Sequence, residues 1–303
     1  MRGLAQLAMR GPLAAALTVA LFAFLSLVFA PALLVSGGLL GLVTLRHGAL
    51  AGLRTLAIAG VICAGTMFAF NGRLGVAAMA IGAAWLPVWG ASLTLRRTGQ
   101  QGAALMNIGI CVLAYAAMMR FANPDVNAFW RERLEVLGQL IEAGGGKFLN
   151  AEQIALYGNL MHAASVALLY IGFACMLLLG RWWQAGLYNP GGFGREFHAL
   201  VLPRWLSPVG AVIALVSMLM RMRGLSGGLA ADGIIVLVLL FSMQGLAVLH
   251  ASCAAKAVSK GWLIGTYVLL SLVPHVVVPI LATTGIADRV VDFRARLRRT
   301  EKS

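Results

Sequence analysis

Charged side chains are scarce in this sequence. Asp, Glu, Lys and Arg make up only 11% of the 303 residues, and 60% of the residues are hydrophobic. Soluble domains carry about 25% charged residues, because polar groups must cover much of the surface that faces water. The composition therefore excludes a soluble globular protein and indicates that lipid surrounds most of the chain.

Acidic residues are the rarer charged type. Ten Asp and Glu stand against 24 Lys and Arg, which gives a net charge of +14. Basic residues at the ends of membrane helices set their orientation and contact anionic lipid, so this charge predicts a lipid bilayer as partner and no nucleic acid. No carboxylate lies in the middle of an apolar segment, and Asp232 and Asp288 lie near segment ends. A relay of acidic residues for protons or sodium ions is therefore not expected.

Metal-binding motifs are absent, and no catalytic motif stands in its required structural context. The four cysteines include no CxxC pair and lie in or at the ends of apolar segments, so we expect free thiols and no metal site. HExxH and paired carboxylates do not occur, and GxSxG occurs only as GLSGG at 224–228, without the preceding β-strand that a catalytic serine turn requires. The GGFGRE stretch at 191–196 lacks the Lys-Ser/Thr pair of a phosphate-binding P-loop. The sequence therefore predicts neither enzymatic activity nor a bound cofactor.

Long apolar segments fill most of the chain. They predict an all-α fold, a polytopic helical transmembrane bundle in which residues 1–303 form a single integral membrane domain. The first segment resembles a signal peptide, but its length and Pro31 directly after it favour a retained span. Nine segments are expected, at 12–30, 31–45, 50–70, 75–95, 102–119, 151–180, 206–220, 232–254 and 262–286.

Basic residues predict the orientation of these segments. Arg2 and Arg10 place the N-terminus in the cytoplasm, and residues 120–150 then form an external loop. Nine crossings would place the basic tail, 287–303, outside, against the same rule. We therefore expect about eight crossings of a bacterial cytoplasmic (inner) membrane, with both termini cytoplasmic and one re-entrant segment. Residues 206–220 are our candidate, because this segment is short and has arginines at both ends.

The external loop contains a predicted amphipathic helix near 124–142. Asn123 and Pro124 are favourable residues for a helix start, and a run of three glycines ends the pattern. Asn150 and Gln153 predict a capping box for the next helix. The apolar stripe indicates a helix on the membrane surface, with a lid or a partner-docking helix as the alternative. Its members are Val126, Trp130, Leu134, Leu137 and Ile141.

A second polar stretch, 181–205, lies between two apolar segments. Its tryptophans and arginines are typical of residues that anchor helices at a membrane surface, so we interpret it as a cytoplasmic interfacial segment. Docking of a cytoplasmic partner is the alternative. The candidate partner or interface residues of this segment and the tail are Arg195, Glu196, His198, Arg204, Trp205, Asp288, Asp292, Phe293 and Arg294.

Four polar residues within apolar segments are candidates for ligand binding. Asn159 and His162 share one helix face, and Gln244 and His250 lie in a later segment. Polar side chains are costly in hydrocarbon, which makes them candidate functional residues. Asn, Gln and His also join helices by hydrogen bonds, so the structural interpretation stays open.

Glycine is abundant, with 36 residues, many of them in clusters. SGGLLG at 36–41 and SGGLAADG at 226–233 are two examples. Small residues let membrane helices approach closely, so we interpret these clusters first as packing sites. A thin-walled ligand pocket between helices is the alternative interpretation.

Four stretches resemble the YybS-like family of bacterial multi-pass membrane proteins, whose function is unknown. This family is distantly similar to the substrate-binding S components of energy-coupling-factor vitamin transporters. That similarity implies a compact helical bundle that captures a small molecule and works with a separate ATPase. No vitamin-pocket motif carries over. The four stretches are PALLVSGGLLGLVTLRHGALAGL (31–53), LPRWL (202–206), FSMQGLAVLH (241–250) and GIADRVVDFRARL (285–297).

Two functional hypotheses follow from the sequence. The first is a transport-type subunit that binds a small molecule within the bundle, with a separate ATPase or another membrane protein as partner. The second is a membrane scaffold or regulator without transport activity, which docks a cytoplasmic partner through the interfacial segment and the tail. A small molecule retained on purification would favour the first hypothesis.

Overall fold

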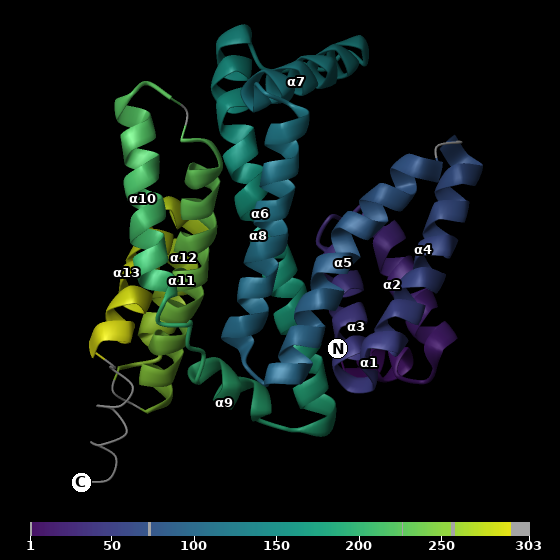
Figure 1. Ribbon diagram of the computed structural model, residues 1–303. Helices are drawn as coiled ribbons and strands as arrows, with labels where there is room; N and C mark the ends of the chain where they lie inside the picture. Colours follow the sequence, from purple (N-terminus) through teal and green to yellow (C-terminus); the bar gives the residue numbers. More distant parts are fainter. Residues whose placement is uncertain (1, 72–73, 226, 256–257, 292–303) are drawn as a thin grey trace. The chain divides into compact units, whose positions relative to one another are not determined.

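Helices are the only regular secondary structure in this computed structural model, which describes residues 2–71, 74–225, 227–255 and 258–291. The predicted all-α fold is therefore confirmed for these ranges, which contain the thirteen helices of Figure 1. The helices are α1 (Arg2–Ala8), α2 (Pro12–Leu25), α3 (Ala32–His47), α4 (Ala49–Asn71), α5 (Leu74–Thr98), α6 (Gln101–Ala122), α7 (Val126–Ala143), α8 (Ala151–Tyr188), α9 (Gly192–His198), α10 (Leu206–Met222), α11 (Gly228–Ala254), α12 (Gly261–Leu272) and α13 (Pro274–Val291).

Four helices in the described ranges are long and apolar enough to cross a membrane. A crossing needs about 20 mostly apolar residues. Helix α4 (over Ala49–Thr66), α6, α8 and α11 meet this requirement, and α2, α3, α10 and α12 are shorter apolar helices. By helix length and hydropathy the chain is a multi-pass membrane protein. The number of crossings stays a prediction.

The helices group into two compact units. Unit 1 comprises Met1–Ile108, Ile171–Arg204 and Leu240–Ser303, and unit 2 comprises Gly109–Tyr170 and Trp205–Leu239. Helices α6, α8 and α11 therefore each contribute one part to unit 1 and one part to unit 2. The single integral membrane domain expected over the whole chain stays a prediction.

The core of unit 1 is apolar and rich in small residues. Helices α2 to α5 pack against one another. The indole Nε1 of Trp85 donates to the Ser36 hydroxyl at 3.2 Å, and this hydroxyl donates to the Val19 carbonyl at 2.8 Å. These bonds join three helices and satisfy buried polar groups. Further members of the core are Ala16, Ala20, Leu39, Leu40, Leu42, Ala59 and Cys63.

Glycines allow the helices of unit 1 to lie close together. A Cβ atom on Gly180 of α8 would lie 2.7 Å from the Gly38 carbonyl oxygen of α3. A Cβ atom on Gly285 of α13 would overlap the Phe241 carbonyl oxygen of α11. No larger residue fits at these contacts without a shift of the backbone. The packing interpretation of the SGGLLG cluster is therefore confirmed.

Basic side chains of unit 1 gather near the end of α3. Arg96 Nη1 donates to the carbonyl oxygens of Leu45, at 2.6 Å, and Arg46, at 2.8 Å. The Arg46 guanidinium lies 4.0 Å from the centre of the Tyr188 ring. These contacts satisfy the last carbonyl groups of α3. The end of α5, which carries Arg96, therefore lies beside the end of α3, which carries Arg46. The positive-inside rule predicts the same side of the membrane for both ends.

The last apolar segment of the sequence, 262–286, is interrupted. Helix α12 ends before Val273, whose φ of −136° and ψ of 58° are not helical, and α13 begins at Pro274. Proline lacks an N–H and disfavours a helical residue before it, which explains the break. Figure 1 shows α13 ending toward the same end of unit 1 as α11. One uninterrupted helix over this segment is therefore not observed.

Residues 206–220, our candidate for a re-entrant segment, form one continuous helix of unit 2. Along α10, a Cβ on Gly210 would contact Leu237 of α11, and a Cβ on Gly233 of α11 would contact Ile213. A later position in α10 thus faces an earlier position in α11, so the two helices are antiparallel. Helix α10 thus contains no turn, and the prediction that 206–220 fails to cross the membrane stays a prediction.

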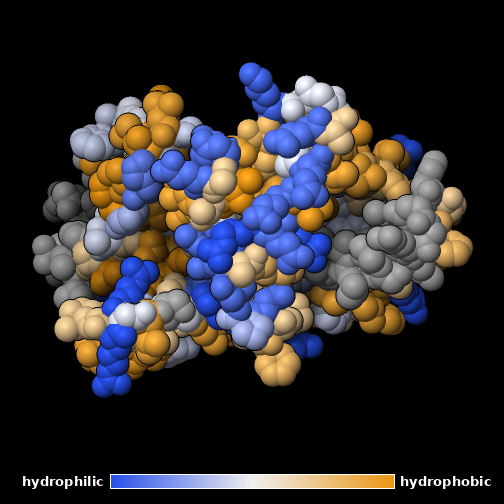
Figure 2. All heavy atoms as spheres, turned by 90° about the horizontal axis from the view of Figure 1, so that it is seen from above, coloured by the Kyte–Doolittle hydropathy of each residue, from blue (hydrophilic) through white to orange (hydrophobic). Residues whose placement is uncertain are grey.

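Helix α7 of unit 2 is the predicted amphipathic helix, with a corrected start. Asp125, rather than Asn123, is the N-cap, and its carboxylate accepts from the Ala128 N–H at 2.9 Å. The capping box before α8 is confirmed, since Asn150 and Gln153 exchange hydrogen bonds of 3.0 and 2.8 Å. Figure 2 shows hydrophilic side chains gathered on the face where α7 lies.

Candidate functional site: a charged cavity in unit 2

A buried ion pair joins α6 and α11 within unit 2. Arg120, in the last turn of α6, donates through Nε to Asp232 Oδ2 at 2.6 Å and through Nη2 to Oδ1 at 2.9 Å. The Asp232 side chain is 2% exposed and that of Arg120 is 28% exposed. A bidentate arginine–carboxylate pair fixes both side chains in one geometry. The pair therefore holds a negative and a positive charge at defined positions.

His162 of α8 contacts the same carboxylate. Its Nε2 lies 3.3 Å from Asp232 Oδ2, and the residue is 4% exposed. Its Nδ1 is buried and has no hydrogen-bond partner in the described part of the chain. When Nε2 donates its proton to Asp232 in a neutral ring, Nδ1 is a hydrogen-bond acceptor, and in the imidazolium form it is a donor. His162 thus has one unsatisfied hydrogen-bonding nitrogen beside the ion pair.

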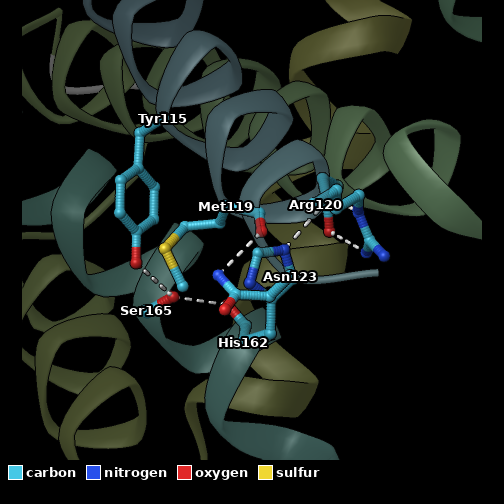
Figure 3. Close-up of polar contacts among 7 residues, drawn as sticks. Tyr115, Met119, Arg120, Asn123, His162 and Ser165 are labelled. Carbon is cyan, nitrogen blue, oxygen red and sulfur yellow. Dashed lines mark hydrogen bonds and ion pairs between the residues drawn. The ribbon is translucent and has the colours of Figure 1, made fainter. Parts of the chain in front are cut away.

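Further hydrogen bonds hold this part of α6 beside α8. Tyr115 Oη donates to Ser165 Oγ at 3.4 Å, and this hydroxyl donates to the His162 carbonyl at 2.7 Å. Asn123 Nδ2 donates to the Met119 carbonyl at 3.1 Å and so closes the end of α6. Figure 3 shows these side chains between the two helices, close to Arg120. They hold the last turns of α6 beside the turn of α8 that carries His162.

These charged groups line a cavity of about 670 Å³ within unit 2. Ligand pockets of proteins commonly have volumes of about 300–1,000 Å³. Arg221, from the last turn of α10, also lines the cavity and forms no ion pair with a described residue. The polar residues of the lining are Arg120, Asp125, Asn127, Asn159, His162, Arg221 and Asp232, and among the apolar ones are Val126, Leu225, Ile234 and Ile235.

The cavity offers hydrogen-bonding groups and charge, but no recognised catalytic arrangement. Asp125 caps α7 and lies 3.7 Å from Arg131, so it is already engaged. Arg221 provides a positive charge for an anionic group, and His162 Nδ1 provides one hydrogen bond. Among the described residues, no group of three or more His, Cys, Asp or Glu side chains is placed to hold a metal ion. The cavity is therefore suited to binding a small polar molecule.

Two of the four ligand-binding candidates from the sequence meet in this cavity. Asn159 and His162 both line it, as their shared helix face predicts. Sequence reasoning missed Arg120, Asp232 and Arg221. The opposite charges of Arg120 and Asp232 at the ends of two apolar segments were the available signal.

Gln244 lies outside the cavity, in the core of unit 1. Its Oε1 accepts from the Leu202 N–H at 2.9 Å, and its Nε2 donates to the Gly285 carbonyl at 3.0 Å and to Asp288 Oδ2 at 3.1 Å. The side chain is fully buried. These three bonds use its amide oxygen and both N–H groups, which supports the structural interpretation left open by the sequence.

His250 belongs to an aromatic cluster of unit 1. Its Nε2 lies 2.9 Å from Tyr267 Oη, and its ring meets Phe197 edge-on with 5.4 Å between centroids. The His198 ring lies 6.3 Å away. Burial lowers the pKa of His198 below its ordinary value of 6.5. These contacts join α9 to α11 and α12 and leave His250 apart from the unit 2 cavity.

The remaining interface candidates are spread over separate contacts. Glu196 pairs with Arg181 through two hydrogen bonds, one of them 2.8 Å from Nε to Oε2. Arg195 Nη2 donates to Asn189 Oδ1 at 3.3 Å. Arg204 and Trp205 are exposed. The structure therefore shows no single docking site formed by these residues in the described ranges.

The tail candidates are only partly described. Asp288 is buried and accepts a hydrogen bond from Gln244, so it has a structural contact rather than an exposed carboxylate. Asp292, Phe293 and Arg294 lie outside the described residues. Their predicted role in partner binding stays a prediction.

Comparisons with known proteins found no match to a family model, a curated protein or a solved structure. The resemblance to the YybS-like family stays a prediction that rests on the four short stretches quoted above.

Proposed function

We propose that this protein is a transport-type membrane subunit that binds a small polar molecule in the unit 2 cavity. The observation that carries the proposal is the cluster of Arg120, Asp232 and His162 at the cavity wall, with His162 Nδ1 lacking a partner. This cluster combines charge, burial and an open hydrogen-bonding position in one place.

The energetic argument favours a binding role over a purely structural one. Replacing a buried ion pair by apolar residues of similar size is often neutral or stabilising. A membrane bundle therefore does not need Arg120 and Asp232 for stability alone. Ionisable groups within a membrane bundle commonly mark a ligand or ion pathway. The adjacent cavity gives these groups space to act on a ligand.

The lining also indicates how a ligand would be oriented. Arg221 attracts an anionic group, and His162 Nδ1 with the Asn159 amide accepts or donates hydrogen bonds. The apolar side of the cavity, which includes Ile234 and Ile235, accommodates a hydrocarbon part. A separate ATPase or another membrane partner, and a bacterial inner-membrane location, remain parts of this proposal that come from the sequence.

The proposed topology has about eight crossings, and the interrupted segment is the one that does not cross. In this topology α10 crosses the membrane and places Arg221 on the external side, where the 120–150 loop lies. Arg221 and Asp125 of that loop line the same cavity, which agrees with this placement. Helix α13 returns toward the end of unit 1 where α11 ends, which keeps the basic tail cytoplasmic. An impermeant maleimide applied to whole cells, with single cysteines in a cysteine-free background, tests this topology. Lys147→Cys should react, and Ser303→Cys should react only after permeabilisation.

The function is tested by purifying the tagged protein in mild detergent and identifying retained small molecules and proteins by mass spectrometry. Wild-type protein should retain a polar metabolite, and Asp232→Asn and His162→Gln should lose it. Asp288→Asn and His275→Gln are matched controls, because neither residue lines the cavity. Those controls should retain the metabolite.

Two outcomes would overturn the proposal. One is a clean protein that carries only lipid from native membranes and shows no thermal shift with any polar metabolite tested. The other is a retained metabolite that survives both cavity substitutions. A stoichiometric cytoplasmic partner without a small molecule would favour the scaffold hypothesis.

A further inference from the structure

We propose that a second cavity, within unit 1, binds the phosphate group of a phospholipid. This cavity has a volume of about 310 Å³ and lies between α1, the end of α8 and the start of α9. It is separate from the charged cavity of unit 2 and shares no lining residue with it. Its lining contains Arg2, Ala5, Trp182, Trp183, Pro190 and Phe193, among others.

The first observation is a buried donor without a partner. Trp183 is 3% exposed, and its Nε1 makes no hydrogen bond with a described residue. An indole nitrogen is a donor only, so it needs an acceptor oxygen. The ring is held in place by α3, since a Cβ on Gly38 would lie 3.0 Å from Trp183 Cζ3. The donor therefore cannot easily turn toward another acceptor.

The second observation is the charge of the lining. Arg2 lines the cavity and forms no ion pair with a described residue. No Asp or Glu lines it, and the nearby Glu196 is paired with Arg181. A positive charge and an unsatisfied N–H donor favour an anionic oxygen ligand such as a phosphate.

The third observation is the apolar character of the rest of the wall. Trp182, Leu187 and Phe193 line the cavity, and Trp182 is 46% exposed. Free phosphate is strongly hydrated and gains nothing from such a surface, whereas the acyl chains of a lipid do. Tryptophan and arginine also concentrate at the level of lipid headgroups. The combination fits a phospholipid rather than a free anion.

The location agrees with the sequence. Arg2 and the 181–205 segment lie far apart in the chain, and each was predicted at the cytoplasmic surface. The structure brings them together within unit 1 around one cavity. A lipid headgroup at that surface would reach both.

The test is native mass spectrometry of the purified, delipidated full chain titrated with phosphatidylglycerol, and with diacylglycerol as the probe that lacks phosphate. The wild-type chain should retain one tightly bound phosphatidylglycerol and no diacylglycerol. Trp183→Phe keeps an aromatic side chain but removes the N–H donor, and should lower the affinity roughly tenfold. Arg2→Gln should have an effect of similar size.

Controls and contradicting outcomes are defined by the same titration. Trp205→Phe and Arg10→Gln replace a tryptophan and an arginine that do not line the cavity, and should bind as wild type does. Equal binding of diacylglycerol, or unchanged affinity in both Trp183→Phe and Arg2→Gln, would overturn the proposal. Inorganic phosphate that displaces the lipid at millimolar concentration would assign the site to a free anion instead.

Discussion

The two units of this protein use different interactions in their interiors. Unit 1 packs helices through glycine, alanine and leucine, and hydrogen bonds of the Ser36 hydroxyl and the Trp85 indole join three of these helices. Unit 2 places an arginine, an aspartate and a histidine against a cavity. Close packing stabilises a bundle, whereas buried charge contributes little net stability. Under the function proposed above, unit 1 is mainly the scaffold and unit 2 carries the site for the small polar molecule.

The largest effect is expected where a side chain is added to the tightest contact of unit 1. In Gly245→Ala the new methyl group overlaps the Leu281 carbonyl of α13, and the backbone must move. We expect a loss of about 3 kcal/mol or more, or failure to accumulate. Thermal unfolding in detergent measures this loss. Gly172→Ala is the control, because nothing lies near its added Cβ, and a similar loss there would contradict the packing argument.

A smaller loss of stability is expected from Asp232→Asn in unit 2. The substitution leaves Arg120 without its carboxylate, at a cost of about 2 kcal/mol, since water reaches part of the arginine. The double variant Arg120→Met with Asp232→Leu should recover most of the stability and still fail to bind ligand. Thermal unfolding and ligand retention, measured side by side, separate the two effects. A double variant that binds ligand would place the binding site elsewhere.

Gln244→Leu is expected to affect unit 1 without affecting the unit 2 cavity. The substitution removes the acceptor of the Leu202 N–H and the donor to Asp288, at a cost of about 1–2 kcal/mol. Hydrogen exchange at Leu202 should increase. Ligand retention should remain as in wild type, and its loss would mean that Gln244 acts on the ligand site.

The smallest expected effect is a pH dependence at His198 of unit 1. Burial favours the neutral ring and lowers the pKa, so the folded state binds the proton less well than the unfolded state. This residue therefore destabilises the fold as the pH falls below 6.5. Unfolding curves of His198→Gln should show a weaker acid sensitivity than those of the wild type. Identical pH profiles would show that His198 makes no net contribution.

Most of the fold follows from local patterns in the sequence. Apolar runs predict the helices, and the Asn150–Gln153 capping box and the amphipathic helix of 124–142 are present with small shifts. The break at Val273 was not predicted, although Pro274 supplies its physical cause. Apolar content alone does not reveal whether a long segment is one helix or two.

The candidate site was only half visible in the sequence. Asn159 and His162 follow from helix periodicity, but the pairing of Arg120 with Asp232 depends on which helices are neighbours. A long-range contact of this kind cannot be derived from spacing alone.

The ion pair of unit 2 also constrains how the chain is made. Arg120 leaves the ribosome 112 residues before Asp232, a delay of roughly 6–20 s at ordinary rates of synthesis. Helices α2 to α5 have all emerged by residue 98 and can pack during that interval. Arg120 must meanwhile keep its guanidinium at the water interface, which its place in the last turn of α6 allows. Biogenesis therefore has a natural order, in which the apolar helices assemble early and the charged cavity closes only when α11 is inserted.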